Sequence, residues 1–307
     1  MTLTLRLLRA IVSLWVIVTL VFLALRATGD PITAIFDPDN TTQAALDAYR
    51  VQWGYSGTIF EQYVVYIGNI LQGDFGFSSM SNRSAASVVF ERLPATLQLV
   101  GLSTLLMIVV GLPIGALAAL NSGGPLDRHV MNFTTVGFAL PNFVLGLVLI
   151  LILSVNMRLL PSNGSGSWQH LVMPVLTIGL SKAAIFTRFV RSSILDAAKL
   201  QCVVSARARG VGEFEIFWRH IVPNAVLPLV TITPLLVGAM VAASAVIESV
   251  FGWPGVGRLI VESVAQRDLA VLQLIIMLIA FVMIATNLIV DLSYAKLDPR
   301  TAAAGAH

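Results

Sequence analysis

One charged stretch separates two long hydrophobic runs of this chain: Ser205-Ala206-Arg207-Ala208-Arg209-Gly210-Val211-Gly212-Glu213-Phe214-Glu215-Ile216-Phe217-Trp218-Arg219-His220-Ile221-Val222-Pro223-Asn224-Ala225. The flanking runs, Leu171–Val190 and Ala225–Val246, are apolar enough to cross a bilayer as helices, because about 20 residues span the hydrocarbon core. A loop with this many charges has little to do inside lipid. We therefore expect it to lie on the aqueous side of a membrane and to dock another molecule there.

The composition places most of the chain in a membrane. Hydrophobic residues make up 57% of the 307 residues and charged residues 11%, and the mean hydropathy is +0.86. In soluble domains charged residues are roughly a quarter of the total. The predicted fold class is an all-α integral membrane protein, because lipid leaves backbone polar groups no partner outside the helix. We expect six transmembrane helices: Ala10–Leu25, Leu97–Leu120, Phe133–Val155, Leu171–Val190, Ala225–Val246 and Ala270–Val290.

The first run follows Arg6 and Arg9, as the core of a signal peptide would. It is long for a cleaved signal, and Leu25-Arg26-Ala27 is a poor cleavage site, so we interpret residues 1–27 as a retained first helix. Basic residues are concentrated in the segments that lie inside if both termini are cytoplasmic. They are Arg6, Arg9, Arg128, Arg188, Arg191, Lys199, Arg207, Arg209, Arg219, Lys296 and Arg300. We expect a multi-pass protein of a bacterial cytoplasmic membrane in this orientation.

The outer segments have structure of their own. Residues 28–93 form a long extracytoplasmic segment in which Gln43–Val51 and Ile59–Leu71 are predicted short helices, the second one amphipathic. A core of five helices is expected over residues 94–293, with an outer loop at residues 248–269 and a cytoplasmic tail at residues 294–307. Within that outer loop, Glu248–Leu259 is apolar but carries three glycines and a proline, which predicts a compact re-entrant or pore-mouth segment.

The charged stretch belongs to a loop over residues 191–223 that has its own helical pattern. Phe214, Phe217, Trp218 and Ile221 follow the spacing of one apolar stripe on a short helix. Gly210 and Gly212 precede the stripe and predict two short helices that meet at an angle. Such a helix fits a groove on a cytoplasmic protein, and the alternative is an amphipathic helix on the inner leaflet.

Together with its neighbours, this loop resembles the ATPase-coupling loop of binding-protein-dependent ABC importer permeases. Ser205, Ala206, Gly210, Ile221 and Pro223 match the family pattern, whereas Val204 stands where the general motif has an acidic residue. The peptide-importer branch commonly lacks that acidic residue, and residues 205–210 look like that branch. The resemblance assigns these residues to the coupling loop: Ser205, Ala206, Arg207, Ala208, Arg209, Gly210, Glu213, Phe214, Phe217, Arg219 and His220.

Further elements that look like those of dipeptide and oligopeptide permeases follow along nearly the whole chain. They are Gly29-Asp30-Pro31, Gly73-Asp74-Phe75-Gly76, Arg92–Leu97, Leu126-Asp127-Arg128, Pro141-Asn142-Phe143, Thr187–Ser193, Glu248–Leu259 and Leu297-Asp298-Pro299-Arg300. Their order and the long outer segment favour the first permease of the pair. The resemblance implies a type I importer architecture with a cytoplasmic coupling helix, and a role as the translocation subunit.

The resemblance also implies partners: a second homologous permease, two cytoplasmic ATPase domains that bind ATP and Mg, and an extracytoplasmic solute-binding protein. The sequence contains no Gly-Lys pair, so it cannot supply a P-loop of its own. We therefore expect neither enzymatic activity nor a cofactor in this chain. Short peptides are the implied substrate, and the alternatives within the family are nickel, glutathione, haem-like compounds and glycosides.

Candidate path and gate residues lie outside the charged loop. Lys182 lies near the middle of the fourth predicted helix, and an intramembrane charge usually faces the interior of a bundle. We assign Lys182, Pro141 and Asn142 to the translocation path, with a structural or snorkelling role as the alternative for the lysine. Four further residues are assigned to the outer gate and to contact with the binding protein: Asp74, Glu248, Trp253 and Arg258.

Two other classes of function compete with this one. A stand-alone secondary transporter predicts inverted repeats or several intramembrane charges, and Lys182 is essentially the one such charge. An intramembrane enzyme requires a catalytic constellation, and Ser103 has no histidine inside a predicted span to act as its base. The four histidines are too scattered to converge on a metal ion: His129, His170, His220 and His307.

Overall fold

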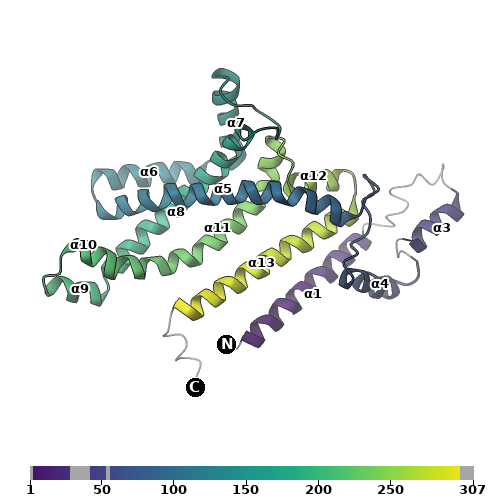
Figure 1. Cartoon of the computed structure of the whole chain (residues 1–307), viewed down its shortest axis with the longest axis horizontal. Coiled ribbons are helices and arrows are strands. Elements are labelled where there is room, and N and C mark those ends of the chain that lie inside the picture. Colours follow the sequence, from purple (N-terminus) through teal and green to yellow (C-terminus); the bar gives the residue numbers. More distant parts are fainter. Residues whose placement is uncertain (1–2, 28–41, 53–55, 298–307) are drawn as a thin grey trace. The chain divides into compact units, whose positions relative to one another are not determined.

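The computed structural model describes residues 3–27, 42–52 and 56–297 of the chain (Figure 1). Among these residues the only extended pairing is an isolated bridge between Phe77 and Ser84, and the regular elements are helices. They are α1 (Leu3–Ala27), α3 (Gln43–Gln52), α4 (Ile59–Leu71), α5 (Ala85–Leu120), α6 (Pro125–Ala139), α7 (Asn142–Leu149), the π-helix η1 (Ile150–Asn156), α8 (Gln169–Ala198), α9 (Gln201–Ala208), α10 (Glu213–Ile216), the π-helix η2 (Phe217–Ile221), α11 (Val222–Val250), α12 (Val256–Ala265) and α13 (Leu269–Leu297).

The long helices agree with the predicted membrane spans. In the described part of the chain four stretches are long and apolar enough to cross a membrane: Ala85–Leu120, Gln169–Ala198, Glu213–Val250 and Leu269–Thr286. A bent pair of helices over residues 125–156 counts as a fifth if the two helices together form one span. The first predicted span lies within α1, which extends over 25 residues. The prediction of an all-α membrane protein is therefore confirmed.

The third predicted span, Phe133–Val155, contains a sharp break in the structure. α6 ends at Ala139, α7 begins at Asn142, and the helices turn by 96° across the break. The reason is Pro141, which has no N–H to donate and which restricts the residue before it to extended backbone. Leu140 accordingly has φ −80° and ψ 125°. Pro174, in contrast, lies inside the continuous helix α8.

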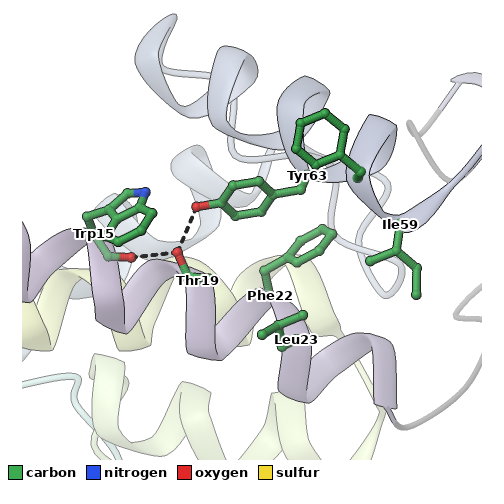
Figure 2. Close-up of a pocket in the computed structure, with 7 residues that line it drawn as sticks. Trp15, Thr19, Phe22, Leu23, Ile59 and Tyr63 are labelled. Atoms are coloured by element: carbon green, nitrogen blue, oxygen red, sulfur yellow. Dashed lines mark hydrogen bonds between the residues drawn. The ribbon is translucent and has the colours of Figure 1, made fainter.

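The chain divides into two compact units, of which the first comprises residues 1–94 and 259–288. In this unit α4 begins with a capping box, in which the Thr58 side chain accepts from the backbone N–H of Glu61 and the Glu61 carboxylate accepts from that of Thr58. Figure 2 shows α1 facing α4 across a small apolar pocket, where the Thr19 and Tyr63 hydroxyls hydrogen-bond at 2.7 Å. The Phe22 ring packs edge-on against that of Tyr63 at 5.3 Å. These contacts fix the amphipathic helix α4 on α1.

The second unit comprises residues 95–258 and 289–307, and α8 lies at its centre. α8 contacts α6, α7 and α11 along its length. Against α5 it packs at glycines that leave no space for a side chain, because a Cβ on Gly115 would lie 2.7 Å from the Thr187 carbonyl oxygen. A Cβ on Gly179 would likewise lie 2.7 Å from Leu106. Small residues at such contacts let membrane helices approach closely and gain packing energy.

Two predicted family elements, Gly29-Asp30-Pro31 and most of Leu297-Asp298-Pro299-Arg300, lie outside the described residues, as does residue 298 onward of the predicted tail.

Candidate functional sites

The loop between α8 and α11, residues 199–221, folds into two short helices, as its glycines predicted. α9 is followed by a turn and then by α10, which continues through η2 into α11. Gly210 in that turn has φ +78°, a conformation that L-residues with side chains rarely adopt. In Figure 1 α9 and α10 lie together at one end of α8 and α11. The loop is thus an ordered element carried by two long helices.

The predicted apolar stripe on this loop is divided between two faces. Ile221 is 6% exposed and Phe217 packs partly buried against the core of the unit, whereas Phe214 and Trp218 are 80% and 56% exposed. The π-turn of η2 accounts for the burial of Ile221, because the wider turn rotates this side chain inward relative to the position it would have on an α-helix. Ile216, which the stripe omitted, is fully buried and anchors the loop. The exposed aromatic pair is therefore Phe214 and Trp218.

Ion pairs hold the two short helices in place. The Arg207 guanidinium donates from Nε and Nη2 to both carboxylate oxygens of Glu213, at 2.6 and 2.9 Å, and so bridges α9 and α10 across the turn at Gly210. This hydrogen bonding, together with the negative charge of Glu213, raises the pKa of Arg207. Arg219 pairs with Glu215 one turn away. Three residues assigned to the coupling loop thus maintain its shape: Arg207, Glu213 and Arg219.

The remaining residues assigned to this loop differ in exposure. Ala206 is fully buried, and Ser205 and His220 are half-buried. Ala208, Arg209 and Gly210 are exposed beside the turn. The surface that the loop offers therefore includes an aromatic pair and Arg209 beside the turn, together with the exposed ion-paired side chains of Glu213 and Glu215.

Two of the candidate path residues are brought to the same level of α8. The Ser181 hydroxyl donates to Asn142 Oδ1 at 2.6 Å, and this bond ties the start of α7 to the middle of α8. Lys182, the next residue, is half-buried, and within the described part of the chain its ammonium group has neither an ion pair nor a hydrogen bond. Pro141 is exposed at the break between α6 and α7. The sequence had no means of showing that Ser181 joins these elements.

A buried ion pair, which the sequence did not predict, joins α6 to α8. The Arg191 guanidinium donates from Nε and Nη2 to the two carboxylate oxygens of Asp127, at 2.5 and 2.7 Å. Asp127 is only 4% exposed, and it also accepts from the backbone N–H of Gly123 at 2.9 Å. Both residues belong to family-like elements of the sequence, but they are 64 positions apart. No local pattern could pair them.

Glu248 is the centre of the segment between α11 and α12. It is fully buried at the end of α11, where its carboxylate accepts from the Thr96 hydroxyl at 2.7 Å and from the Arg258 backbone N–H at 2.9 Å. The Thr96 oxygen in turn accepts from the Val256 N–H at 2.8 Å. These amides are the free donors at the N-terminus of α12, where a carboxylate is favoured by the helix dipole.

The glycines of this segment make room for the carboxylate. A Cβ on Gly255 would lie 2.3 Å from Glu248, and one on Gly257 would lie 2.5 Å from the Ala245 backbone. The Trp253 indole donates to the Ala95 carbonyl at 2.9 Å and its side chain is 5% exposed. The compact segment predicted at Glu248–Leu259 is confirmed.

Glu248 and Trp253, which were assigned to the outer gate and to contact with the binding protein, are buried in this chain and bind the segment to α5. The Arg258 guanidinium, which is half-buried, donates to the Gly252 carbonyl at 3.1 Å. Asp74 is exposed in the first unit, where it accepts from the Gly76 N–H at 3.0 Å. Of these four residues, only Asp74 presents an exposed side chain.

The helices, the broken third span and the two-helix loop define a multi-pass permease with the architecture of a type I ABC importer subunit. Residues 111–303 match the family described as binding-protein-dependent transport system inner membrane component. The chain belongs to this family, whose members are transport permeases rather than enzymes.

The comparisons with individual proteins agree with this family. The chain is 38% identical over 295 residues to the glutathione transport system permease protein GsiC of Escherichia coli strain K12, and the match covers 96% of each chain. The corresponding protein of Shigella dysenteriae serotype 1 gives the same values, 38% and 96%. The fold is similar to that of an inward-facing structure of the MetNI methionine ABC transporter, with a TM-score of 0.60 and 19% identity, over 69% of this chain and 97% of that chain.

Proposed function

We propose that the chain is one of two translocation subunits of an ATP-driven importer of short peptides. It would form the substrate path with a second homologous permease, receive substrate from an extracytoplasmic binding protein, and be driven by two cytoplasmic ATPase domains that bind ATP and Mg. Family membership supports the permease role. The name of the GsiC relatives supports a peptide-like substrate, because glutathione is itself a tripeptide.

The observation that carries the proposal is the exposed aromatic pair on an ordered loop. Phe214 and Trp218 lie 6.4 Å apart, ring centroid to ring centroid, on a loop that ion pairs and buried isoleucines hold in shape. A large exposed aromatic surface costs solvation energy unless a partner covers it. In the proposed orientation both termini are cytoplasmic, and this pair enters a groove on an ATPase domain while the basic turn at Gly210 forms the rim. Lys182, Pro141 and Asn142 belong to the path in this proposal, and Asp74 to the outer surface.

The test is ATP-dependent uptake by the assembled complex. The chain is co-expressed with the second permease, the ATPases and the binding protein encoded beside it, and the purified complex is reconstituted in proteoliposomes. Labelled trialanine and labelled glutathione are offered as separate substrates. We expect uptake of at least one of them that requires both ATP and the binding protein. Uptake that persists without the ATPase subunits would instead favour a stand-alone transporter, and uptake of neither peptide would overturn the substrate class.

A further inference from the structure

The apolar pocket between α1 and α4 has a volume of about 400 Å³ (Figure 2). Four residues of α1 and three of α4 line it, and almost all of its surface is carbon. Among the lining side chains, Trp15, Leu23 and Phe60 remain 55%, 48% and 74% exposed. Apolar side chains gain free energy when an apolar group covers them. A hydrocarbon ligand in the pocket would cover all three.

The two hydroxyl groups in the lining are occupied with each other. The Thr19 hydroxyl donates to the Trp15 carbonyl at 2.8 Å, so at the 2.7 Å contact between the hydroxyls of Tyr63 and Thr19 the tyrosine is the donor (Figure 2). Each hydroxyl has one hydrogen, and both hydrogens are used in this chain of bonds. The pocket therefore offers no free donor from these groups to a polar ligand, and its chemistry selects an apolar one.

The pocket follows α1 through one half of a membrane. α1 contains the first predicted span, and Trp15 is at the middle of this 25-residue helix. Leu23 lies closer to its C-terminal end by about 12 Å, at the helical rise of ~1.5 Å per residue. One leaflet contributes about 15 Å of a hydrocarbon core that is ~30 Å thick. The pocket thus has the depth and the direction of an acyl chain in one leaflet.

The size of the pocket argues against a helix of another subunit as the occupant. Two helical turns with their side chains, about 10 Å wide and about 11 Å long, occupy roughly 850 Å³. This is about twice the volume between α1 and α4. An acyl chain is a single row of methylene groups, so it enters a space that is too narrow for a helix.

We propose that this pocket binds one acyl chain of a membrane phospholipid, which lies along α1 from Trp15 to Leu23. The chain packs between the indole of Trp15 and the ring of Phe60, and so adds to the contacts that fix the amphipathic helix α4 on α1. A lipid held in this way is a component of the first unit, unlike the lipids that exchange freely around it.

Photo-labelling tests the position of this lipid. The membrane complex that contains the chain is purified in detergent and given a small amount of phosphatidylethanolamine with a diazirine in one acyl chain. Leu20 is the matched control, because it lies two residues from Phe22 on the opposite side of α1 and is 60% exposed. After irradiation we expect mass spectrometry to find adducts at Trp15, Leu23 or Phe60 and few at Leu20. Equal labelling of Trp15 and Leu20 would show that lipid only surrounds the helix, and would overturn the proposal.

Two variants of α4 test whether the pocket itself holds the lipid. Ile59→Trp fills the pocket, whereas Val64→Trp adds the same ring at a position of similar exposure, 55% against 61%, outside the lining. If the indole displaces only two methylene groups of the chain, binding weakens about tenfold. We therefore expect adducts at Trp15 to fall about tenfold in Ile59→Trp and to stay unchanged in Val64→Trp. Equal adduct yields in the two variants contradict the assignment. Leu23→Trp, from the other wall, replaces Ile59→Trp if that variant does not assemble.

The identity of the occupant is tested in intact membranes. Phe60 is replaced by the photoreactive residue benzoylphenylalanine, and the mass of whatever it attaches to is measured after irradiation. We expect a phospholipid. Attachment to another protein subunit instead would show that protein covers the pocket, and would overturn the proposal.

Discussion

The substitution Glu248→Gln tests whether a carboxylate is required where α12 meets α5. The groups that contact the side chain oxygens are donors, namely the Thr96 hydroxyl at 2.7 Å and the Arg258 N–H at 2.9 Å. A carboxamide of the same shape offers one acceptor oxygen and turns an NH₂ group toward the other donor. One charged hydrogen bond is lost, at about 1.5–3 kcal/mol, and one buried donor is left unpaired, at about 1–3 kcal/mol. We expect the variant to lose about 3–5 kcal/mol of stability.

This loss is measured by thermal unfolding of the purified complex in detergent. A fluorescent fusion of this chain is heated, and the fraction that stays folded is read by size-exclusion chromatography. A destabilisation of this size lowers Tm by roughly 6–20 °C, at about 2–4 °C per kcal/mol for a large domain. Thr96→Val removes the hydroxyl that both donates to Glu248 and accepts from Val256, so it should act in the same direction. Thr96→Ser keeps both bonds and is the matched control. A Glu248→Gln protein as stable as the wild type would show that the carboxylate is not what holds this segment.

Three further outcomes follow from the structure. Trp218→Asp, made together with Phe214→Asp, should abolish ATP-dependent uptake and co-purification of the ATPase while leaving membrane insertion normal; retained co-purification would contradict the docking role. Gly115→Ala should lower the stability by the ~1–3 kcal/mol of an overpacked contact, and Tm with it, since its Cβ would lie 2.7 Å from backbone. Gly238→Ala, with nothing within 4 Å, should not; equal effects would disprove close packing as the cause. The hydrogen bonds at the start of α4 lower the pKa of Glu61, so this carboxylate stabilises the helix above its unfolded pKa and ceases to do so as the pH falls through the folded pKa. The protection factors for hydrogen exchange at the start of α4 should therefore fall at acidic pH in the wild type and depend less on pH in Glu61→Gln; identical pH profiles of the protection factors would refute this.

The sequence was sufficient for those parts of the fold that depend on local pattern. Hydrophobic length located the spans, and the period of residues 59–71 located α4 with the observed bounds. Glycines predicted the turn at Gly210 and the compact segment after Glu248. Each of these features is decided by neighbouring residues, so one sequence contains the necessary information.

Features that depend on contacts between distant segments were not predictable. The Asp127–Arg191 pair and the Thr96–Glu248 bond join residues 64 and 152 positions apart. The inward turn of Ile221 depends on a π-turn, which has no signal in the apolar spacing. Pro141 indicated that the third span could bend, but not that the two helices would turn by 96° there. For the candidate path, the chain indicated that Lys182 was unusual but did not show its neighbours.

The bidentate bond between Arg191 and Asp127 has a mechanical consequence. It clamps the beginning of α6 to the end of α8 that carries the short helices of the loop. Force from the proposed ATPase partner at those short helices would thus reach two helices, α6 and α8, instead of one, because packed helices transmit it as a rigid-body shift. The helix that Arg191 holds, α6, extends from Pro125 to Ala139. The nearest point at which the backbone can bend is therefore the break at Leu140 and Pro141, next to Asn142. We infer that a movement imposed at one end of this unit would change the angle between α6 and α7, beside the proposed substrate path.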